Sequence, residues 1–194
     1  MKILITRPID EAILLAEELT NLGHHPVIAP LLEIELFKNI DFQNFDKYEA
    51  IIISSKNSIK AISNADRSLK LFIIGKQTTE FAKSLGFMNS IYAGSNIIEL
   101  KDYIQSYSNL LYLSGTDISD DLRSLDKKIT RLEVYQAKII ESASNEFLSF
   151  IKLDHLKLCL FFSKRTAQIF LDHIKKYKLE SYCDKILSLS LSDN

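Results

Sequence analysis

The feature that most constrains the fold is a short apolar strand that ends in small hydroxyl residues and passes directly into a helix. It is clearest within residues 49–62, where residues 51–53 form an isoleucine run that is apolar on both faces. Such a run is typical of a buried central strand in a parallel sheet. Four residues of the types that cap helix N-termini come next: Ser54, Ser55, Asn57 and Ser58. The pattern predicts a strand followed by a helix that begins near Ser58.

The same junction returns within residues 158–170. The segment 55–58 (SKNS) aligns with the segment 163–166 (SKRT), and apolar strands and helices follow in step on either side. The period of this repeat is far too long for a solenoid. Alternating strands and helices therefore predict two similar α/β domains, each with a parallel sheet.

Two extended stretches, residues 24–37 and 129–140, bracket one complete series of strands and helices. Pro26 and Pro30 exclude a helix from the first stretch, and both stretches alternate apolar with polar residues. We expect the two stretches to pair antiparallel. The predicted fold class is α/β, with two flavodoxin-like, parallel-sheet domains joined by a two-stranded β ribbon.

The ribbon divides the chain into its expected domains. Domain 1 would combine residues 1–36 with residues 138–194, and is therefore discontinuous; domain 2 would comprise residues 37–137. By comparison with residues 78–107, domain 1 would lack a helix and a further strand–helix unit. We therefore expect domain 1 to be truncated at its C-terminus.

Composition limits the classes of partner. The 194 residues carry a net charge of -1, which gives no electrostatic reason to expect nucleic acid or an anionic membrane. No apolar run approaches the roughly 18 residues of a transmembrane helix. The N-terminus enters a strand directly and lacks a signal-peptide pattern. Cys159 and Cys183 lie within apolar patterns and are interpreted as buried thiols of a cytoplasmic protein.

Polar side chains recur immediately after the predicted strands. In open parallel sheets, ligands bind at the carboxyl ends of strands, where helix N-termini attract anions. At any one junction these residues fit simple helix capping equally well, but their recurrence favours a cleft for a ligand with several carboxylates or phosphates. The candidate binding residues are Thr6, Arg7, Ser54, Ser55, Asn57, Ser58, Gly75, Thr78, Ser114, Gly115, Ser163, Arg165 and Thr166.

The sequence predicts no metal site and no cofactor. His155 and His173 have no Cys or His at ligand spacing, and the adjacent His24 and His25 would point to opposite faces of a strand. The segment 75–78 lacks the upstream glycine of a phosphate-binding loop. Tyr135, on the ribbon, is the candidate proton donor to a leaving group. The alternative for Tyr135 is an exposed strand residue without a chemical role.

Seven short motifs, taken in order, resemble the uroporphyrinogen-III synthase family. They are ILITRP (3–8), PVIAPLLEI (26–34), IIISSKNSI (51–59), IGKQTT (74–79), LYLSG (111–115), VYQA (134–137) and FFSKRT (161–166). The resemblance covers essentially the whole chain. It implies two α/β domains joined by a two-stranded ladder.

The resemblance also implies an activity. Members of this family are lyases that cyclise hydroxymethylbilane to uroporphyrinogen III, with inversion of ring D and loss of water, without cofactor or metal. The implied substrate is a linear tetrapyrrole with eight carboxylates, and the family tyrosine that matches Tyr135 assists loss of the hydroxyl. We expect a cytoplasmic monomer. The alternative is a non-catalytic truncated relative or a two-lobed polycarboxylate-binding module, because Asp193 stands near the position equivalent to Thr78 and would repel a carboxylate.

Overall fold

The computed structural model describes residues 1–118, 121–124, 128–152 and 156–190. The chain forms two compact units: unit 1 comprises Met1–Glu33 with Lys138–Asn194, and unit 2 comprises Ile34–Ala137. These described residues form two sheets, one of four strands and one of six. Among the described helices, none is long and apolar enough to cross a membrane.

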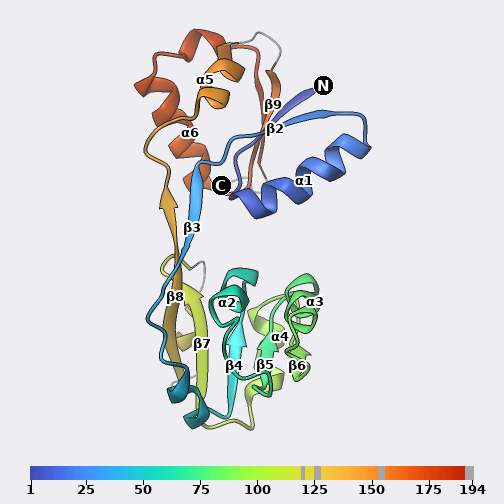
Figure 1. The fold of residues 1–194 in the computed structure, drawn as a ribbon, viewed down its shortest axis with the longest axis vertical. Helices are drawn as coiled ribbons and strands as arrows, with labels where there is room; N and C mark the ends of the chain where they lie inside the picture. Colours follow the sequence, from blue (N-terminus) through green and yellow to red (C-terminus); the bar gives the residue numbers. More distant parts are fainter. Residues whose placement is uncertain (119–120, 125–127, 153–155, 191–194) are drawn as a thin grey trace. The chain divides into compact units, whose positions relative to one another are not determined.

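The sheet of unit 1 combines strands from both ends of the chain. Its order is β10-β9-β1-β2, and all neighbouring pairs are parallel. The strands are β1 (Lys2–Ile5), β2 (His25–Ile28), β9 (Leu156–Phe161) and β10 (Leu187–Ser190). The helices are α1 (Ile9–Asn21), α5 (Asn145–Lys152), α6 (Lys164–Lys176) and the short 3-10 helix η3 (Glu180–Tyr182). Figure 1 shows α1 on one side of this sheet and α5 and α6 on the other.

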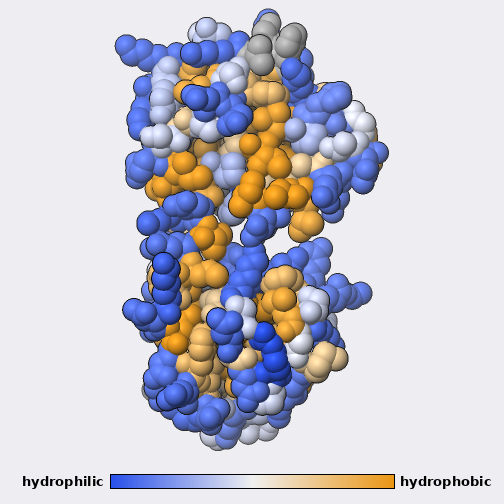
Figure 2. Space-filling view, in the orientation of Figure 1, coloured by the Kyte–Doolittle hydropathy of each residue, from blue (hydrophilic) through white to orange (hydrophobic). Residues whose placement is uncertain are grey.

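One edge of this sheet is exposed. Every residue of β10 is exposed, including Leu187 at 69% and Leu189 at 58%. Figure 2 shows apolar residues at the visible surface of this unit among hydrophilic ones. An exposed edge strand with apolar side chains is a site where other chains can pair.

The sheet of unit 2 is central to the site described below. Its order is β3-β8-β7-β4-β5-β6. The strands are β3 (Leu32–Leu36), β4 (Ala50–Ile53), β5 (Leu71–Ile73), β6 (Ser90–Tyr92), β7 (Leu110–Gly115) and β8 (Ile129–Ile139). The helices are η1 (Phe42–Lys47), α2 (Lys56–Ala61), α3 (Lys76–Ser84), α4 (Ile97–Ile104) and η2 (Leu122–Ser124).

Strand β4 shows why this sheet is covered on both faces. Ile51 and Ile53 belong to an apolar cluster with residues of α2 and α3, whereas Ile52 belongs to a second cluster with residues of α4. Successive side chains of a strand point to opposite faces, so the isoleucine run fills both layers. All four residues of β4 are buried, as the apolar run predicts.

Strands β3 and β8 form the ribbon. The Phe37 N–H donates to the Val134 carbonyl at 3.0 Å, and the Ile140 N–H donates to the Leu31 carbonyl at 3.1 Å. As residue numbers rise from Leu31 to Phe37, the numbers of their bonded partners fall from Ile140 to Val134, so the pair is antiparallel. The predicted fold class, two parallel-rich α/β sheets and a two-stranded ribbon, is confirmed; the domain limits for independent folding stay a prediction.

Two local predictions were wrong. Helix α2 begins at Lys56, not near Ser58, because Ser55 is the residue whose hydroxyl accepts the Asn57 N–H. Residues 114–117, at the end of β7, also resemble a strand-to-helix junction and predict a helix near 117–125. No α-helix forms in the described part of that range, where Asp121 accepts the Arg123 N–H and a single 3-10 turn follows. His155 and Asp193 lie outside the described residues.

Candidate functional site

The carboxyl edge of the sheet in unit 2 contains a pocket of about 390 Å³. We call it the edge pocket. Its walls come from the ends of β4, β5 and β7, the start of α4, and strand β8. It is lined by Ser54, Ser55, Ile74, Ser95, Asn96, Ile97, Tyr112, Gly115, Asp117, Ile118, Leu122 and Tyr135. The sequence-predicted residues that meet here are Ser54, Ser55, Gly115 and Tyr135.

Two hydroxyls meet on one wall of the edge pocket. The Ser54 Oγ and the Tyr112 phenol oxygen are 3.0 Å apart, and either can donate the hydrogen bond. Burial raises the pKa of Tyr112 above its ordinary value of 10.0, and the bond to Ser54 offsets only part of this rise. The Tyr112 phenol therefore stays protonated at neutral pH and can donate a hydrogen bond.

Tyr135 lies directly over the backbone of Gly115. A Cβ added at Gly115 would lie 2.7 Å from Cε2 and Cζ of Tyr135 and 3.1 Å from its hydroxyl oxygen. The two residues pair between β7 and β8 after a register shift that begins at Ser114. Bulges of this kind re-aim a side chain. Tyr135 is half-buried against the same apolar cluster as Val134, so it is not simply an exposed residue of the ribbon.

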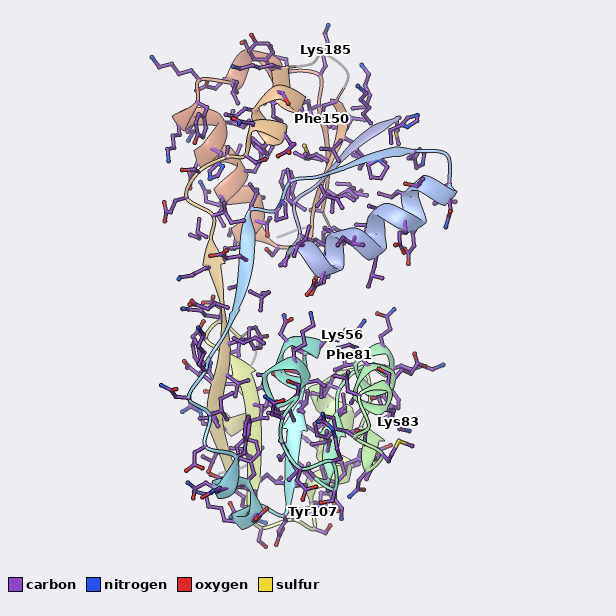
Figure 3. All side chains as sticks on the ribbon, viewed as in Figure 1. Lys56, Phe81, Lys83, Tyr107, Phe150 and Lys185 are labelled. Carbon is purple, nitrogen blue, oxygen red and sulfur yellow. The ribbon has the colours of Figure 1, made fainter. Side chains whose placement is uncertain are left out.

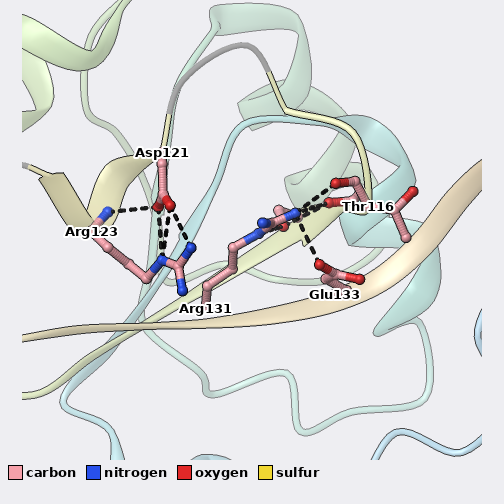
Figure 4. Close-up of polar contacts among 7 residues, drawn as sticks. Thr116, Asp121, Arg123, Arg131 and Glu133 are labelled. Carbon is pink, nitrogen blue, oxygen red and sulfur yellow. Dashed lines mark hydrogen bonds and ion pairs between the residues drawn. The ribbon is translucent and has the colours of Figure 1, made fainter.

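Arg131 binds residues 114–116, the last two residues of β7 and the one after them, a segment that we call the turn (Figure 4). Its Nε donates to the Ser114 Oγ at 2.8 Å, and its Nη2 donates to the carbonyls of Gly115 and Thr116 at 2.7 and 2.9 Å. The side chain is only 13% exposed, and Glu133 lies 3.2 Å from it as an ion pair. Hydrogen bonds from a charged donor each contribute about 1.5–3 kcal/mol, whereas the half-exposed ion pair contributes little.

The helix that begins in the edge pocket, α4, is already capped. The Asn96 Oδ1 accepts the N–H groups of Ile98 and Glu99 at 2.9 and 3.1 Å, and the Glu99 carboxylate accepts the Ser95 N–H at 3.0 Å. These donors are occupied by the chain itself. Helix α3 differs, because its N-cap is Gly75, which has a φ of 93° and supplies no side-chain cap.

The other predicted residues of unit 2 lie near the same edge. Lys56, which stands between the predicted residues Ser55 and Asn57 and is the first residue of α2, lies at the opposite end of the unit from Tyr107 (Figure 3). Ser58 is buried, and its Oγ donates to the Leu113 carbonyl at 2.9 Å. Ser114 is also buried and donates to the Gly115 carbonyl at 2.9 Å. Asn57 and Thr78 are half-buried at the first turns of α2 and α3.

The remaining predicted residues belong to unit 1. Thr6 is buried, and its hydroxyl donates to the Leu160 carbonyl at 2.9 Å, which joins the ends of β1 and β9. Arg7 stacks 4.3 Å from the Phe162 ring centre and pairs with Glu11. Ser163 caps α6 by accepting the Thr166 N–H at 3.1 Å, and Thr166 is buried. Arg165 is exposed beside them.

Sequence reasoning missed Tyr112 and Arg131. Tyr112 stands inside the apolar run of β7. Arg131 lies 16 residues along the chain from Gly115, the β7 residue whose carbonyl it binds. Tyr112 carries a hydroxyl within an apolar run, whereas Arg131 is one of several polar residues in an alternating stretch, so residue type alone does not single it out. Within the part of the chain that the structure describes, no group of three or more His, Cys, Asp or Glu side chains could hold a metal ion.

The family profile described as Uroporphyrinogen-III synthase HemD matches residues 14–190, which is most of the chain. The chain belongs to this family. The resemblance in the sequence motifs is therefore confirmed at the level of the family.

Individual relatives agree with this family. The chain is 28% identical over 204 residues to a porphyrin biosynthesis protein HemD from Ruminiclostridium josui, covering 93% of this chain and 40% of the relative. It is 33% identical over 138 residues to a candidate uroporphyrinogen-III synthase from Methanocaldococcus jannaschii, covering 64% of this chain and 57% of the relative. The chain thus spans about two fifths and 57% of the lengths of these two relatives.

A solved structure shares the fold. A mutant uroporphyrinogen III synthase from the extremely thermophilic bacterium Thermus thermophilus aligns with a TM-score of 0.52 at 8% identity, over 98% of this chain and 84% of that chain. At this identity the likeness shows the fold alone.

Proposed function

We propose that this chain is a uroporphyrinogen-III synthase, a lyase that cyclises hydroxymethylbilane to uroporphyrinogen III with inversion of ring D and loss of water. The observation that carries the proposal is Tyr135 over Gly115 in the edge pocket, beside the Ser54–Tyr112 hydroxyl pair. Family membership supplies the reaction. The proposal includes a cytoplasmic monomer that acts without a cofactor.

Tyr135 would act at the leaving group. Its phenol O–H donates to the hydroxyl oxygen of hydroxymethylbilane as the carbon–oxygen bond breaks. The hydroxyl leaves as water with the donated proton, and the pyrrole nitrogen lone pair forms the electrophilic azafulvene. Attack by the substituted carbon of ring D gives a spiro intermediate without loss of a proton. The original bond between that carbon and its methylene then breaks, which forms a second protonated azafulvene, and the unsubstituted carbon of ring D attacks this methylene to close the inverted macrocycle. The proton lost from the unsubstituted carbon restores the phenol.

Positioning would supply much of the remaining rate. End-to-end closure without inversion competes, so the reactive chain must be held in the geometry that favours the substituted carbon. Substrate carboxylates would bind hydroxyl and cationic side chains at strand ends. Within unit 2, the uncapped first turn of α3 at Gly75 and Thr78 supports such binding.

Replacement of Tyr135 by Phe tests the proposal. Because the ring stays, the melting temperature should change little, while the rate of uroporphyrinogen III formation should fall roughly 10–10⁴-fold. Tyr107→Phe is the matched control: Tyr107 is also half-buried, its phenol lies 3.4 Å from the Lys70 Nζ, and it lies at the other end of unit 2. Tyr107→Phe should keep the wild-type rate.

The alternative function is binding without catalysis, by a truncated relative or a two-lobed polycarboxylate-binding module. Tight binding of a tetrapyrrole polycarboxylate by wild-type protein, with no formation of the III isomer, would identify this alternative. An unchanged rate in Tyr135→Phe, with wild-type activity present, would remove Tyr135 from the reaction.

A further inference from the structure

We propose that Arg131 is the positioning residue of the edge pocket, and that it acts on the reaction through Tyr135. The inference rests on the proposed function and deepens it. Arg131 would hold the turn of residues 114–116 against strand β8, so that the Tyr135 hydroxyl keeps one position in the edge pocket.

The first step of the argument is the contact between Arg131 and the turn. Three consecutive residues, 114–116, each accept one hydrogen bond from the same guanidinium, at 2.7–2.9 Å. A planar guanidinium with several fixed donors can bind three acceptors at once, whereas a lysine ammonium cannot reproduce that geometry. The turn therefore has one favoured position relative to β8.

The second step is the contact between the turn and Tyr135. The Thr116 N–H donates to the Tyr135 carbonyl at 3.0 Å. Gly115 lies beneath the Tyr135 ring so closely that a single added carbon would overlap it. A displacement of the turn would therefore change both the backbone bond of Tyr135 and the surface on which its ring rests.

The third step separates positioning from substrate binding. The described residues that line the edge pocket do not include Arg131, although they include Gly115 and Tyr135. Arg131 lines a different cavity of 810 Å³ between β8 and residues 35–48. A residue that bound substrate directly would change KM, whereas a positioning residue changes the turnover number.

The experiment compares Arg131→Met and Arg131→Lys with wild type. Both should lower kcat, by roughly 10–100-fold for Met, because a displacement of about 1 Å in a reacting group costs on the order of 10²-fold. KM should stay within about threefold of wild type. In the Tyr135→Phe background, Arg131→Met should lower kcat by less than about threefold, since the group it positions is already absent.

The matched control is Arg67→Met. Arg67 also donates to a backbone carbonyl, that of Ser63, and stacks 4.3 Å from the Phe87 ring centre, but it lies outside the edge pocket. Its loss should lower the melting temperature without changing kcat. A raised KM with unchanged kcat in the Arg131 variants, or full multiplicative losses in the double variant, would overturn the proposal.

A second readout does not depend on activity. Amide hydrogen exchange at Thr116 should speed up at least roughly tenfold in Arg131→Met and less in Arg131→Lys, while exchange in β4 stays at the wild-type rate. Unchanged exchange at Thr116 would contradict the proposal that Arg131 holds residues 114–116, even if catalysis were lost. If wild-type protein forms no III isomer but Thr116 exchange responds, the proposed function fails and the positioning of Tyr135 stands. If Arg131→Met does not fold, Arg131→Lys decides both readouts.

Discussion

The contact between Gly115 and Tyr135 predicts the effect of adding one carbon atom to the site. In Gly115→Ala the new Cβ would lie 2.7 Å from the Tyr135 ring, whereas ordinary contact begins at 3.4 Å, so the ring must move by the difference, 3.4 − 2.7 = 0.7 Å. The atoms affected are at the far end of a half-buried side chain, which can swing outward. The stability loss should therefore stay at the lower end of overpacking, about 1 kcal/mol.

The same movement should be costly for the reaction. The Tyr135 hydroxyl oxygen, 3.1 Å from the new Cβ, moves with the ring. A shift approaching 1 Å in a reacting group lowers the rate by roughly 10–100-fold. The coupled assay of uroporphyrinogen III formation measures this loss, and thermal melting measures the stability.

A second background tests whether the overlap with the ring is the cause. In Tyr135→Ala the ring is absent, so adding Gly115→Ala should cause no further loss of stability. Wild-type activity and melting temperature in Gly115→Ala, or an equal stability loss in both backgrounds, would refute the close contact on which the reasoning depends.

Three further predictions concern the rest of the chain. Burial lowers the pKa of His173 below 6.5, and its Nδ1 has no hydrogen-bond partner among the described atoms. Unfolding therefore takes up protons, so the free energy of unfolding should decline as pH falls below about 6.5. His173→Phe should flatten that decline in melts from about pH 8 to 5. Burial raises the pKa of Cys159 to about 12, so iodoacetamide should modify Cys183 first in the native protein, and equal rates would contradict the buried placement. We also propose that unit 2 is an independent domain: a fragment of residues 34–137 should melt cooperatively, and a fragment without a melting transition would contradict this.

Local signals in the sequence were enough to predict the strand-to-helix junctions. The isoleucine run before Ser54 identifies β4, since an apolar stretch with no polar face must be buried on both sides. The stretches that form β3 and β8 alternate apolar with polar residues, which predicts an exposed ribbon instead of a strand buried on both faces. These predictions depend on neighbours in the chain, which the sequence displays directly.

The arrangement of the site depends on register, which local patterns do not determine. Tyr135 meets Gly115 only because the pairing of β7 with β8 shifts after Ser114. Arg131 reaches the turn through that same pairing. Helix phase has a similar effect: a start at Lys56 leaves Ser54 exposed at the edge pocket and places Ser58 on the buried face of α2, although both were equal candidates by residue type.

The most direct test is the isomer composition formed from hydroxymethylbilane by the wild-type chain. The substrate closes without an enzyme to the I isomer, so the III isomer reports catalysis with inversion of ring D. We predict that uroporphyrinogen III is the main product and that Tyr135→Phe shifts the product toward the I isomer as the enzymatic rate falls. Formation of the I isomer alone, at the rate seen without protein, would contradict the assignment of a synthase to this chain.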